Sequence, residues 1–387
     1  MKFLITTSPG LEEENAKEIL ELTGLEPEIQ PGGVLVINSE MDAVYRILCG
    51  SFLSSRVLMP LGEFHAWEKE ILYLETKKIP WETIIAEGET FVCDVHGRPD
   101  NCDYSAAQGL LKVKDAIVDR IREKRGSRPD VNKDNPTHQI EMLFWQGKAE
   151  LSVDLSGEPL HRRAYRKQHG AAPLRESRAA AMLRMSGFLE KHYDYLIDPF
   201  CGSGTIPIEA AMMLRKIPPA NKRYIPKKNF ISNFSKDYLQ TLTDLRAGIL
   251  EECPTRILAS DIDSSMIPKA RRTAENAGVG KDIQFEVMDF EAIDYRVKAP
   301  MLLVSNPPYG ERLDDEFEAK QNLAALGKKL KFESDVEKLV LLIPKGMEGA
   351  VGFKPSKKKA WKAGPLDLLA ASYDLWKGPK KSKDNEK

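Results

Sequence analysis

From residue 195 onward, short apolar segments alternate with longer segments of helical periodicity, and this alternation constrains the fold more than any other feature. The apolar segments are YLIDPF, RILASDID, IQFEVMDF, MLLVSNPP and KLVLLIP. Strands that alternate regularly with helices predict an α/β fold with a doubly wound parallel sheet. Ligands of such folds bind where the strands end at the carboxyl edge of the sheet. The residues that end these segments are therefore the first candidates for a functional site.

The first of these segments ends in Asp198 and continues into a turn that contains Gly202 and Gly204, with a helix expected directly after it. A glycine-rich turn lets a ligand approach the backbone, and the free amides of the following helix N-terminus can bind it. The pattern is not the NAD fingerprint, because Pro207 and Lys222 stand where a third glycine and an acidic residue are needed. It is not a Walker loop either, since no Gly-Lys-Ser/Thr sequence follows.

Two more carboxylates are expected at the same sheet edge, at the ends of the second and third segments. Asp261 is placed to hold a ribose diol through two hydrogen bonds, and Asp289 to accept a hydrogen bond from an adenine amino group. Aspartates also commonly cap helices and end strands, and for Asp263 a capping role is an equally good interpretation. Together with Asp198, the carboxylates at three successive strand ends favour a nucleoside ligand.

The fourth segment ends in Asn306-Pro307-Pro308-Tyr309, a rigid and kinked tip, because proline has no N–H to continue a strand ladder. The Asn306 side-chain oxygen and the Pro307 carbonyl form a pair of acceptors that suits an exocyclic NH₂ group. Accepting both N–H groups stabilises the positive charge that develops when this weakly nucleophilic nitrogen attacks an electrophile. Tyr309 would supply a face on which a flipped base stacks. The pattern indicates an enzyme that positions a nucleobase amine for reaction, with no general base required.

These motifs resemble the class I S-adenosylmethionine-dependent methyltransferases that modify exocyclic amines. The stretches LHRRAYRKQHGAAPLRESRAAAMLRMSG, LIDPFCGSGTIPIEAAMM and SNPPYGERL are similar to those of the THUMP-containing RNA methyltransferases. Within that group, the chain resembles the large-subunit rRNA guanine-N2 methyltransferase K/L family, in a short form with one methyltransferase domain. The resemblance implies that S-adenosylmethionine is bound by Asp198, Pro199, Cys201, Gly202, Ser203, Gly204, Thr205, Asp261, Ile262, Asp289, Phe290 and Asn306. It also implies that Asn306, Pro307, Pro308 and Tyr309 act on the target base.

The resemblance and the strand pattern together imply a Rossmann-like methyltransferase domain preceded by ferredoxin-like and THUMP α/β domains. The expected divisions are a ferredoxin-like domain at 1–60, a THUMP RNA-binding domain at 61–156, a basic linker at 157–178, the methyltransferase domain at 179–379 and a flexible tail at 380–387. Family members differ from this chain at Ala164 and at Ala363, neither of which lies in the motifs that carry the chemistry.

Formal net charge is −1, so an RNA-binding surface must come from local clusters of cations. Such clusters lie in the linker and in a long insertion after the first sheet helix. Residues expected to contact RNA are Arg162, Arg163, Arg166, Arg175, Lys222 and Arg223, although ordinary solvated ion pairs are an equally good interpretation for any one of them. Five scattered cysteines and dispersed histidines indicate a reducing cytoplasm and no metal site.

The sequence therefore predicts a cytoplasmic enzyme that methylates the exocyclic N2 of guanosine, with 23S ribosomal RNA favoured as substrate. Adenine N6 and cytosine N4 in DNA stay open as targets, because an Asn-Pro-Pro-Tyr tip suits any of these amines. Transfer RNA stays open as an alternative to ribosomal RNA. A ribosome-assembly factor that binds RNA without catalysis is a further alternative. The sequence does not indicate the target nucleotide or the oligomeric state.

Overall fold

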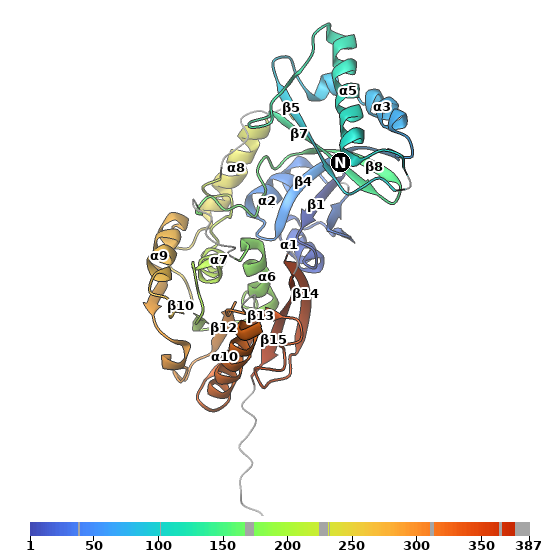
Figure 1. Ribbon diagram of the computed structural model, residues 1–387. Helices are drawn as coiled ribbons and strands as arrows, with labels where there is room; N and C mark the ends of the chain where they lie inside the picture. The colour runs from blue at the N-terminus through green and yellow to red at the C-terminus, as the bar shows by residue number, and fades with distance from the viewer. Residues whose placement is uncertain are drawn as a thin grey trace, which may run out of the picture. The chain divides into compact units, whose positions relative to one another are not determined.

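The structure is a computed structural model that describes residues 1–37, 39–100, 102–166, 174–223, 231, 233–309, 313–363 and 366–375. The chain forms two compact units, each built on one β-sheet (Figure 1). The first unit comprises Met1–Ser8, Asn15–Arg162 and Pro219–Ala247, and the second comprises Pro9–Glu14, Arg163–Pro218 and the described part of Gly248–Lys387. The expected domain boundaries near residues 60, 156 and 178 stay predictions.

The first unit contains an eight-stranded sheet with the order β2-β3-β1-β4-β8-β7-β5-β6. Its strands are β1 (Phe3–Thr7), β2 (Glu28–Gln30), β3 (Gly33–Val36), β4 (Ser54–His65), β5 (Thr90–His96), β6 (Asp130–Val131), β7 (His138–Trp145) and β8 (Lys148–Asp154). The long strand β4 pairs with β1 on one side and β8 on the other, so the predicted ferredoxin-like and THUMP segments share one sheet. Strands β7 and β8 form a hairpin that turns at Gln146 and Gly147, which both have positive φ, as a two-residue type I′ loop requires.

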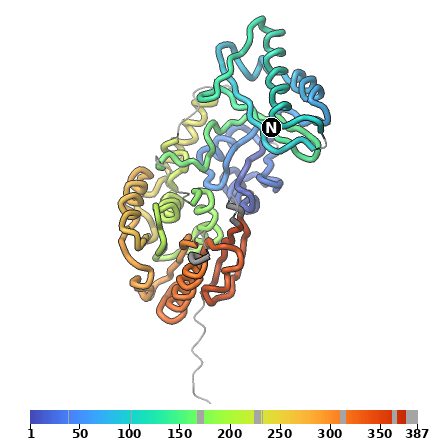
Figure 2. Tube along the Cα trace, in the orientation of Figure 1, coloured from blue at the N-terminus to red at the C-terminus, as the bar shows by residue number. Residues whose placement is uncertain are grey.

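Helices α1 (Glu12–Thr23), α2 (Met41–Gly50), α3 (Lys69–Lys78), α4 (Trp81–Ile84) and α5 (Ala106–Arg125) lie between these strands. The long insertion that follows the first helix of the second sheet contains a further helix, α8 (Phe234–Ala247). This helix packs beside α2 (Figure 2). Phe234, Tyr238 and Leu242 are buried, and their spacing of four residues places them on one face of α8. The ring of Phe234 lies 5.3 Å from that of Tyr45 in α2, centroid to centroid.

The second unit contains a seven-stranded sheet with the order β11-β10-β9-β12-β13-β15-β14. Its strands are β9 (Tyr195–Asp198), β10 (Arg256–Asp261), β11 (Ile283–Val287), β12 (Met301–Ser305), β13 (Val336–Pro344), β14 (Lys357–Ala363) and β15 (Leu366–Asp374). The predicted strands β9 to β13 are confirmed and pair in parallel. The sheet is not parallel throughout, because β15 is antiparallel to both β13 and β14. The connection from Ala363 to Leu366 is too short for a crossover, so β14 and β15 must form a hairpin.

The order of the strands reverses between β9 and β12, which are neighbours although β10 and β11 lie between them in the sequence. Helices α6 (Glu176–Ser186), α7 (Thr205–Leu214), α9 (Met266–Ala277) and α10 (Leu313–Phe332) and the 3₁₀ turn η1 (Phe290–Ala292) accompany this sheet. Helix α6 packs against β12, β13 and α7, and α7 packs against β9 and β10. Helix α10 contributes Ala319, Leu323, Leu326 and Leu330 to an apolar core under the parallel strands.

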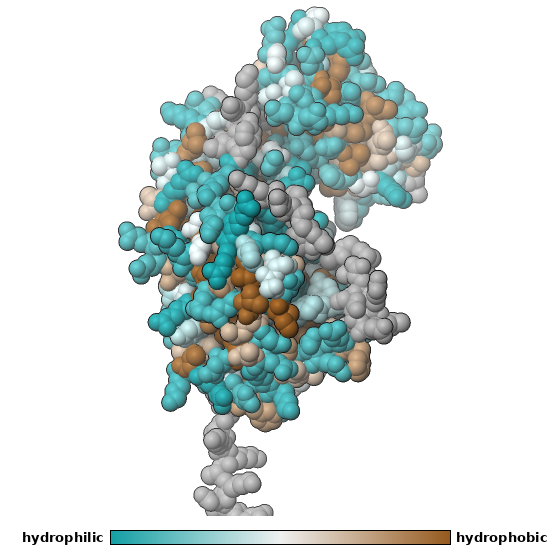
Figure 3. Space-filling model, turned by 60° about the vertical axis from the view of Figure 1, so that its left-hand side comes forward, coloured by the Kyte–Doolittle hydropathy of each residue, from teal (hydrophilic) through white to brown (hydrophobic). Residues whose placement is uncertain are grey.

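Hydrophilic side chains cover most of the face shown in Figure 3, and hydrophobic side chains gather in small patches between them. Two buried clusters of apolar side chains, one in each unit, form the cores. None of the helices in the described part of the chain has both the length and the apolar character that a bilayer crossing requires.

Candidate active site at the carboxyl edge of the second sheet

The glycine loop of residues 198–205 connects β9 to α7 and lies at the point where the strand order reverses. The Cys201 amide donates to the Ser260 carbonyl of β10 at 2.9 Å, and the Gly204 amide donates to the Cys201 carbonyl at 2.8 Å. These bonds close the loop against the neighbouring strand. Open α/β sheets bind ligands at such a reversal, so this loop lies where a ligand is expected.

The two glycines of the loop have different surroundings. Gly204 has φ of +82°, and a Cβ added there would lie 3.2 Å from the Ala270 Cβ and 3.4 Å from an Ile208 methyl carbon. Gly202 has φ of +51°, but a Cβ added there would meet no atom within 4 Å. Gly204 is therefore needed for close packing of α7 on α9, whereas Gly202 presents its backbone to open space.

Asp261, at the end of β10, connects the second strand to the glycine loop. Its Oδ2 accepts a hydrogen bond from the Gly202 amide at 2.8 Å, and its Oδ1 accepts one from the Asp263 amide at 2.9 Å. The next residue, Ile262, has 71% of its surface exposed, and Val287 at the end of β11 has 55%. The carboxylate and the two apolar side chains lie at neighbouring strand ends, as a ribose and an adenine ring would require.

The other acidic residues predicted at this edge have partners of their own. The Asp263 carboxylate accepts from the Ser265 amide at 2.8 Å, in the turn before α9, whose N-cap is Ser265; a capping role for Asp263 stays a prediction. The Asp289 carboxylate accepts from the Glu291 amide at 2.9 Å and caps η1. Phe290 is buried, and its ring lies 5.1 Å from that of Phe200 in the glycine loop. Asp289 and Phe290 thus have structural roles, and their contacts with a ligand stay predictions.

Asp198 is the most deeply buried acid of the site, with 1% of its surface exposed. Burial raises its pKa to about 7, although the Ser305 hydroxyl and the Phe200 amide, which both donate to the carboxylate, act in the opposite direction. The nearby Asp261 carboxylate raises the pKa further. Burial also raises the pKa of the Cys201 thiol, and Asp198 adds to this effect. The thiol therefore stays protonated, which fits a packing role and not that of a nucleophile.

Asn306 to Tyr309 leave the end of β12 next to the glycine loop. The Asn306 Oδ1 is buried and accepts no hydrogen bond from the described residues. Pro307 is buried, Pro308 is exposed, and Tyr309 is half-buried against the apolar core of the second sheet. A buried acceptor without a donor is unfavourable, and a ligand that donates to it would remove this penalty. The site thus holds a preformed acceptor at the predicted position.

A buried charged cluster lies under the glycine loop, and the sequence pattern did not predict it. The Arg163 guanidinium contacts the Glu209 carboxylate at 3.2 Å, with side-chain exposures of 1% and 0%, and the Tyr165 hydroxyl donates to Glu209 at 2.7 Å. Arg166 donates to the Thr205 hydroxyl at 2.6 Å and contacts Glu176 at 3.3 Å. Both arginines therefore attach the segment before α6 to helix α7.

These contacts revise the predicted RNA contacts. The prediction is wrong for Arg163 and for Arg223, because both are buried; Arg223 donates to the Ser156 carbonyl at 2.8 Å. Arg166 is also largely covered and bonded within the second unit. Arg162, Arg175 and Lys222 are exposed, so contact with RNA stays a prediction for these three. Tyr224, Lys227 and Lys228 of the same insertion lie outside the described residues.

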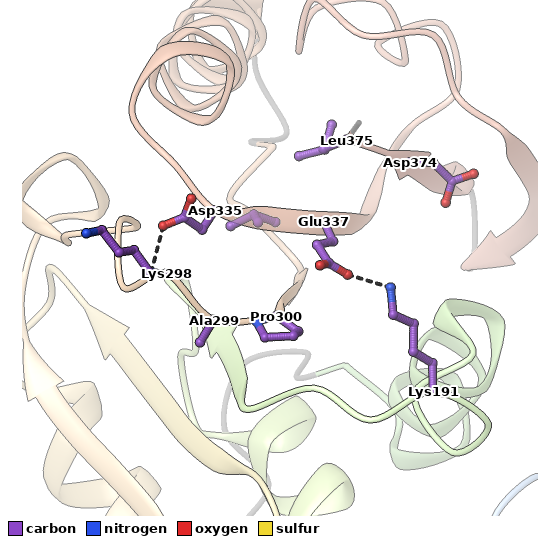
Figure 4. Close-up of a pocket in the computed structure, with 9 residues that line it drawn as sticks. Lys191, Lys298, Ala299, Pro300, Asp335, Glu337, Asp374 and Leu375 are labelled. Carbon is purple, nitrogen blue, oxygen red and sulfur yellow. Dashed lines mark hydrogen bonds and ion pairs between the residues drawn. The ribbon is translucent and has the colours of Figure 1, made fainter. Parts of the chain in front are cut away.

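A separate cavity of about 580 Å³ lies at the opposite, amino edge of the second sheet (Figure 4). It is lined by Lys191, Lys298, Ala299, Pro300, Asp335, Val336, Glu337, Asp374 and Leu375. Its acidic side chains already have partners: Glu337 pairs with Lys191, Asp374 pairs with Lys338, and Asp335 accepts from the Lys298 backbone amide. Because ligands of open α/β sheets bind at the carboxyl edge, this cavity is not the candidate site.

The described residues hold no cluster of metal-ligating side chains.

Residues 163–369 match the family model for the RMKL-like methyltransferase domain, and residues 68–154 match that for the THUMP domain. The chain belongs to the RMKL-like methyltransferase family. The first match covers the glycine loop, Asp261 and the Asn306–Tyr309 tip, so the whole candidate site lies within the methyltransferase domain.

Curated relatives of this chain include the ribosomal RNA large subunit methyltransferase K/L of Pseudoalteromonas atlantica. The two are 38% identical over 320 residues, which cover 81% of this chain and 45% of the relative. The namesake from Psychromonas ingrahamii is 34% identical, over 97% of this chain and 50% of the relative. The chain thus spans about half the length of the curated relatives it matches.

Solved structures share the fold over almost the whole chain. A possible methylase from Clostridium difficile 630 is 28% identical, with a TM-score of 0.87, over 98% of this chain and 99% of that one. SMU.472, a methyltransferase solved in complex with SAH, is 23% identical, with a TM-score of 0.86 and coverage of 98% and 99%. At 23% identity, the similarity to SMU.472 shows only that the two proteins share a fold.

The packing around Gly204 predicts the effect of a single added methyl group. Gly204→Ala is expected to lower the free energy of unfolding by roughly 2–3 kcal/mol, because a left-handed backbone disfavours a Cβ and the Ala270 methyl group, 3.2 Å from it, would have to move. Gly278→Ala is the matched control, since Gly278 has φ of +84° but nothing within 4 Å of an added Cβ. It should lose only about 1 kcal/mol. Equal losses in urea denaturation would show that the α7–α9 contact is not tight.

The pKa of Asp198 predicts how stability depends on pH. Since burial raises this pKa from 3.8 to about 7, the folded state holds a proton that the unfolded state releases. The free energy of unfolding should therefore fall as pH rises between these values, by at most about 1.4 kcal/mol per pH unit from this group. Asp198→Asn removes the contribution, so the variant should gain stability relative to wild type as pH rises from about 4 to about 7. Parallel pH profiles in urea denaturation would contradict the assignment.

The buried pair predicts that Arg163 stabilises the fold and does not bind RNA. Glu209→Ala is expected to cost roughly 3–5 kcal/mol, because it removes the carboxylate that faces a buried guanidinium. Replacing both partners, as Arg163→Met with Glu209→Leu, should recover most of the loss, and its RNA affinity should equal that of wild type. A double variant that is stable but binds RNA at least tenfold more weakly in filter binding would restore the original prediction.

Proposed function

We propose that this chain transfers a methyl group from S-adenosylmethionine to the exocyclic N2 of a guanosine, most directly in large-subunit ribosomal RNA. The observation that carries the proposal is the buried Asn306 Oδ1, an acceptor without a donor among the described residues, at the strand end next to the glycine loop. An exocyclic amine is the kind of donor that fits such an acceptor. The methyltransferase family of the chain supplies the class of reaction.

The residues at the carboxyl edge fit S-adenosylmethionine. Gly202 offers open backbone for the methionine portion, Asp261 offers a carboxylate for the ribose diol, and Ile262 offers exposed apolar surface for the adenine ring. When bound, this cofactor supplies a methyl group attached to a positively charged sulfur. SMU.472, which shares the fold, was solved with SAH, the product left after methyl transfer. The fit and the fold together support this cofactor.

Asn306 and Pro307 would act on the amine of the target base. Their oxygens would accept its two N–H groups, hold the nitrogen lone pair toward the methyl group and stabilise the positive charge formed on nitrogen. The amine nitrogen would form the new N–C bond as the S–C bond of the cofactor broke, and it would then lose one proton to solvent. Tyr309 would stack on the flipped base. Since positioning carries this chemistry, no buried general base is needed.

RNA as the substrate class is supported by the THUMP match over residues 68–154 and by exposed cations at Arg162, Arg175 and Lys222. Ribosomal RNA is supported by the names of the K/L relatives. The predicted division into ferredoxin-like, THUMP and methyltransferase domains, and a cytoplasmic location, belong to the same proposal. Transfer RNA is the alternative substrate, since the acceptor pair does not distinguish the RNA that carries the amine.

Asn306→Ala tests the role of the buried acceptor. The variant should lower kcat about 10²- to 10³-fold, the range seen when a preorganised polar group is removed from a reacting centre. Its dissociation constant for S-adenosylhomocysteine should change far less, because the ribose and methionine contacts remain. Asn306→Asp keeps an acceptor oxygen and should retain more activity than Asn306→Ala. Methylation of ribosomal RNA by Asn306→Ala at the wild-type rate would eliminate the proposed mechanism.

A further inference from the structure

Ser305 is the last residue of β12 and directly precedes Asn306. Its side chain is fully buried, and its hydroxyl donates a hydrogen bond to Oδ1 of Asp198. Asp198 is the last residue of β9 and directly precedes the glycine loop. One side-chain hydrogen bond thus connects the strand that carries the acceptor for the amine to the strand that carries the cofactor loop.

The backbone cannot make this connection. The β9–β12 ladder pairs Leu303 with Ile197 and continues no further, so Ser305 and Asp198 lie beyond its end. Two prolines prevent the ladder from extending, because proline has no N–H. Pro199 directly follows Asp198, and Pro307 lies two positions after Ser305. Where parallel strands separate, the Ser305–Asp198 bond holds their ends together. Its position coincides with the reversal of strand order.

The bond is also the kind that keeps a fixed geometry. Both groups are almost inaccessible to water, and the acceptor is a carboxylate that also accepts from the Phe200 amide at 3.3 Å. Water cannot replace either partner at this depth, so breaking the bond would leave a buried carboxyl group and a buried hydroxyl without each other. The same carboxylate fixes the start of the glycine loop. Movement of one strand end is therefore transmitted to the other.

We propose that Ser305 is a positioning residue that sets the distance between the target amine at Asn306 and the methyl donor at the glycine loop. The inference rests on the proposed function and adds to it a residue that touches neither base nor cofactor. Methyl transfer needs the two reacting atoms in line and in near contact, and a displacement of about 1 Å can lower the rate about 10²-fold. Loss of the bond should therefore affect kcat more than binding.

Two variants of the same shape isolate the hydroxyl. Ser305→Thr keeps it, whereas Ser305→Val replaces it with a methyl group; Ser305→Ala removes it without adding volume. Ser305→Ala and Ser305→Val should lower kcat about 10- to 100-fold, with the KM for ribosomal RNA and the dissociation constant for S-adenosylhomocysteine within about threefold of wild type. Ser305→Thr should recover most of the activity. Ser372→Ala is the matched control, because Ser372 is buried in the same sheet and its hydroxyl has no partner in the described structure.

Hydrogen–deuterium exchange gives a readout that does not depend on turnover. Amides of residues 198–205 should exchange faster in Ser305→Ala and Ser305→Val than in wild type, Ser305→Thr or Ser372→Ala. Equal kcat and equal exchange for the Thr and Val variants would overturn the positioning role, whatever their melting temperatures. A wild-type protein that methylates no guanosine would overturn the proposed function instead, and the exchange experiment would still decide whether the bond holds the loop.

Discussion

The active site depends on one topological constraint: β9 and β12 are adjacent parallel strands that must leave the sheet at the same edge. Their connections run in opposite directions from this point, which opens a crevice between the two strand ends. The glycine loop follows one strand and the Asn306–Tyr309 tip follows the other. The fold thus brings together the loop proposed to bind the cofactor and the proposed acceptor for an amine, although more than a hundred residues separate them in the sequence.

Buried charge maintains this arrangement, and it does so with few groups. Asp198 lies between the two strand ends, where two donors compensate part of the free energy needed to bury it. Below the loop, Glu209 of helix α7 faces Arg163 and Tyr165. Replacing both partners of a buried ion pair with apolar residues changes the free energy of unfolding little, whereas removing one partner lowers it strongly. The pair therefore requires that its two groups stay adjacent. These contacts hold α7, and with it the start of the glycine loop, in one position.

The sequence predicted the parts of this site that depend on local chemistry. The alternation of short apolar segments with helical segments predicted strands β9 to β13. Because Asp198, Asp261 and Asn306 end or follow these strands, the sequence also predicted that they lie at one edge of the sheet. Side-chain partners over long sequence distances could not be predicted this way: Arg163 was counted with the exposed cations because nothing local indicates that Glu209 lies opposite. Ser305 could have been noticed as a polar residue that ends an apolar strand. The antiparallel β14–β15 hairpin was missed because its lysine-rich strand lacks an apolar run, and helix α8 because its insertion begins with loop-like residues.

The account is tested most directly by the chemical identity of the product. The purified protein would be incubated with labelled S-adenosylmethionine and, separately, with ribosomal RNA, transfer RNA and genomic DNA that lack the modification; the digested nucleosides would then be identified by mass spectrometry. The account predicts N2-methylguanosine in ribosomal RNA, and label at guanosine in transfer RNA would change the substrate but keep the chemistry. Label on adenine N6, or no label in any nucleic acid while S-adenosylhomocysteine still binds, would contradict it.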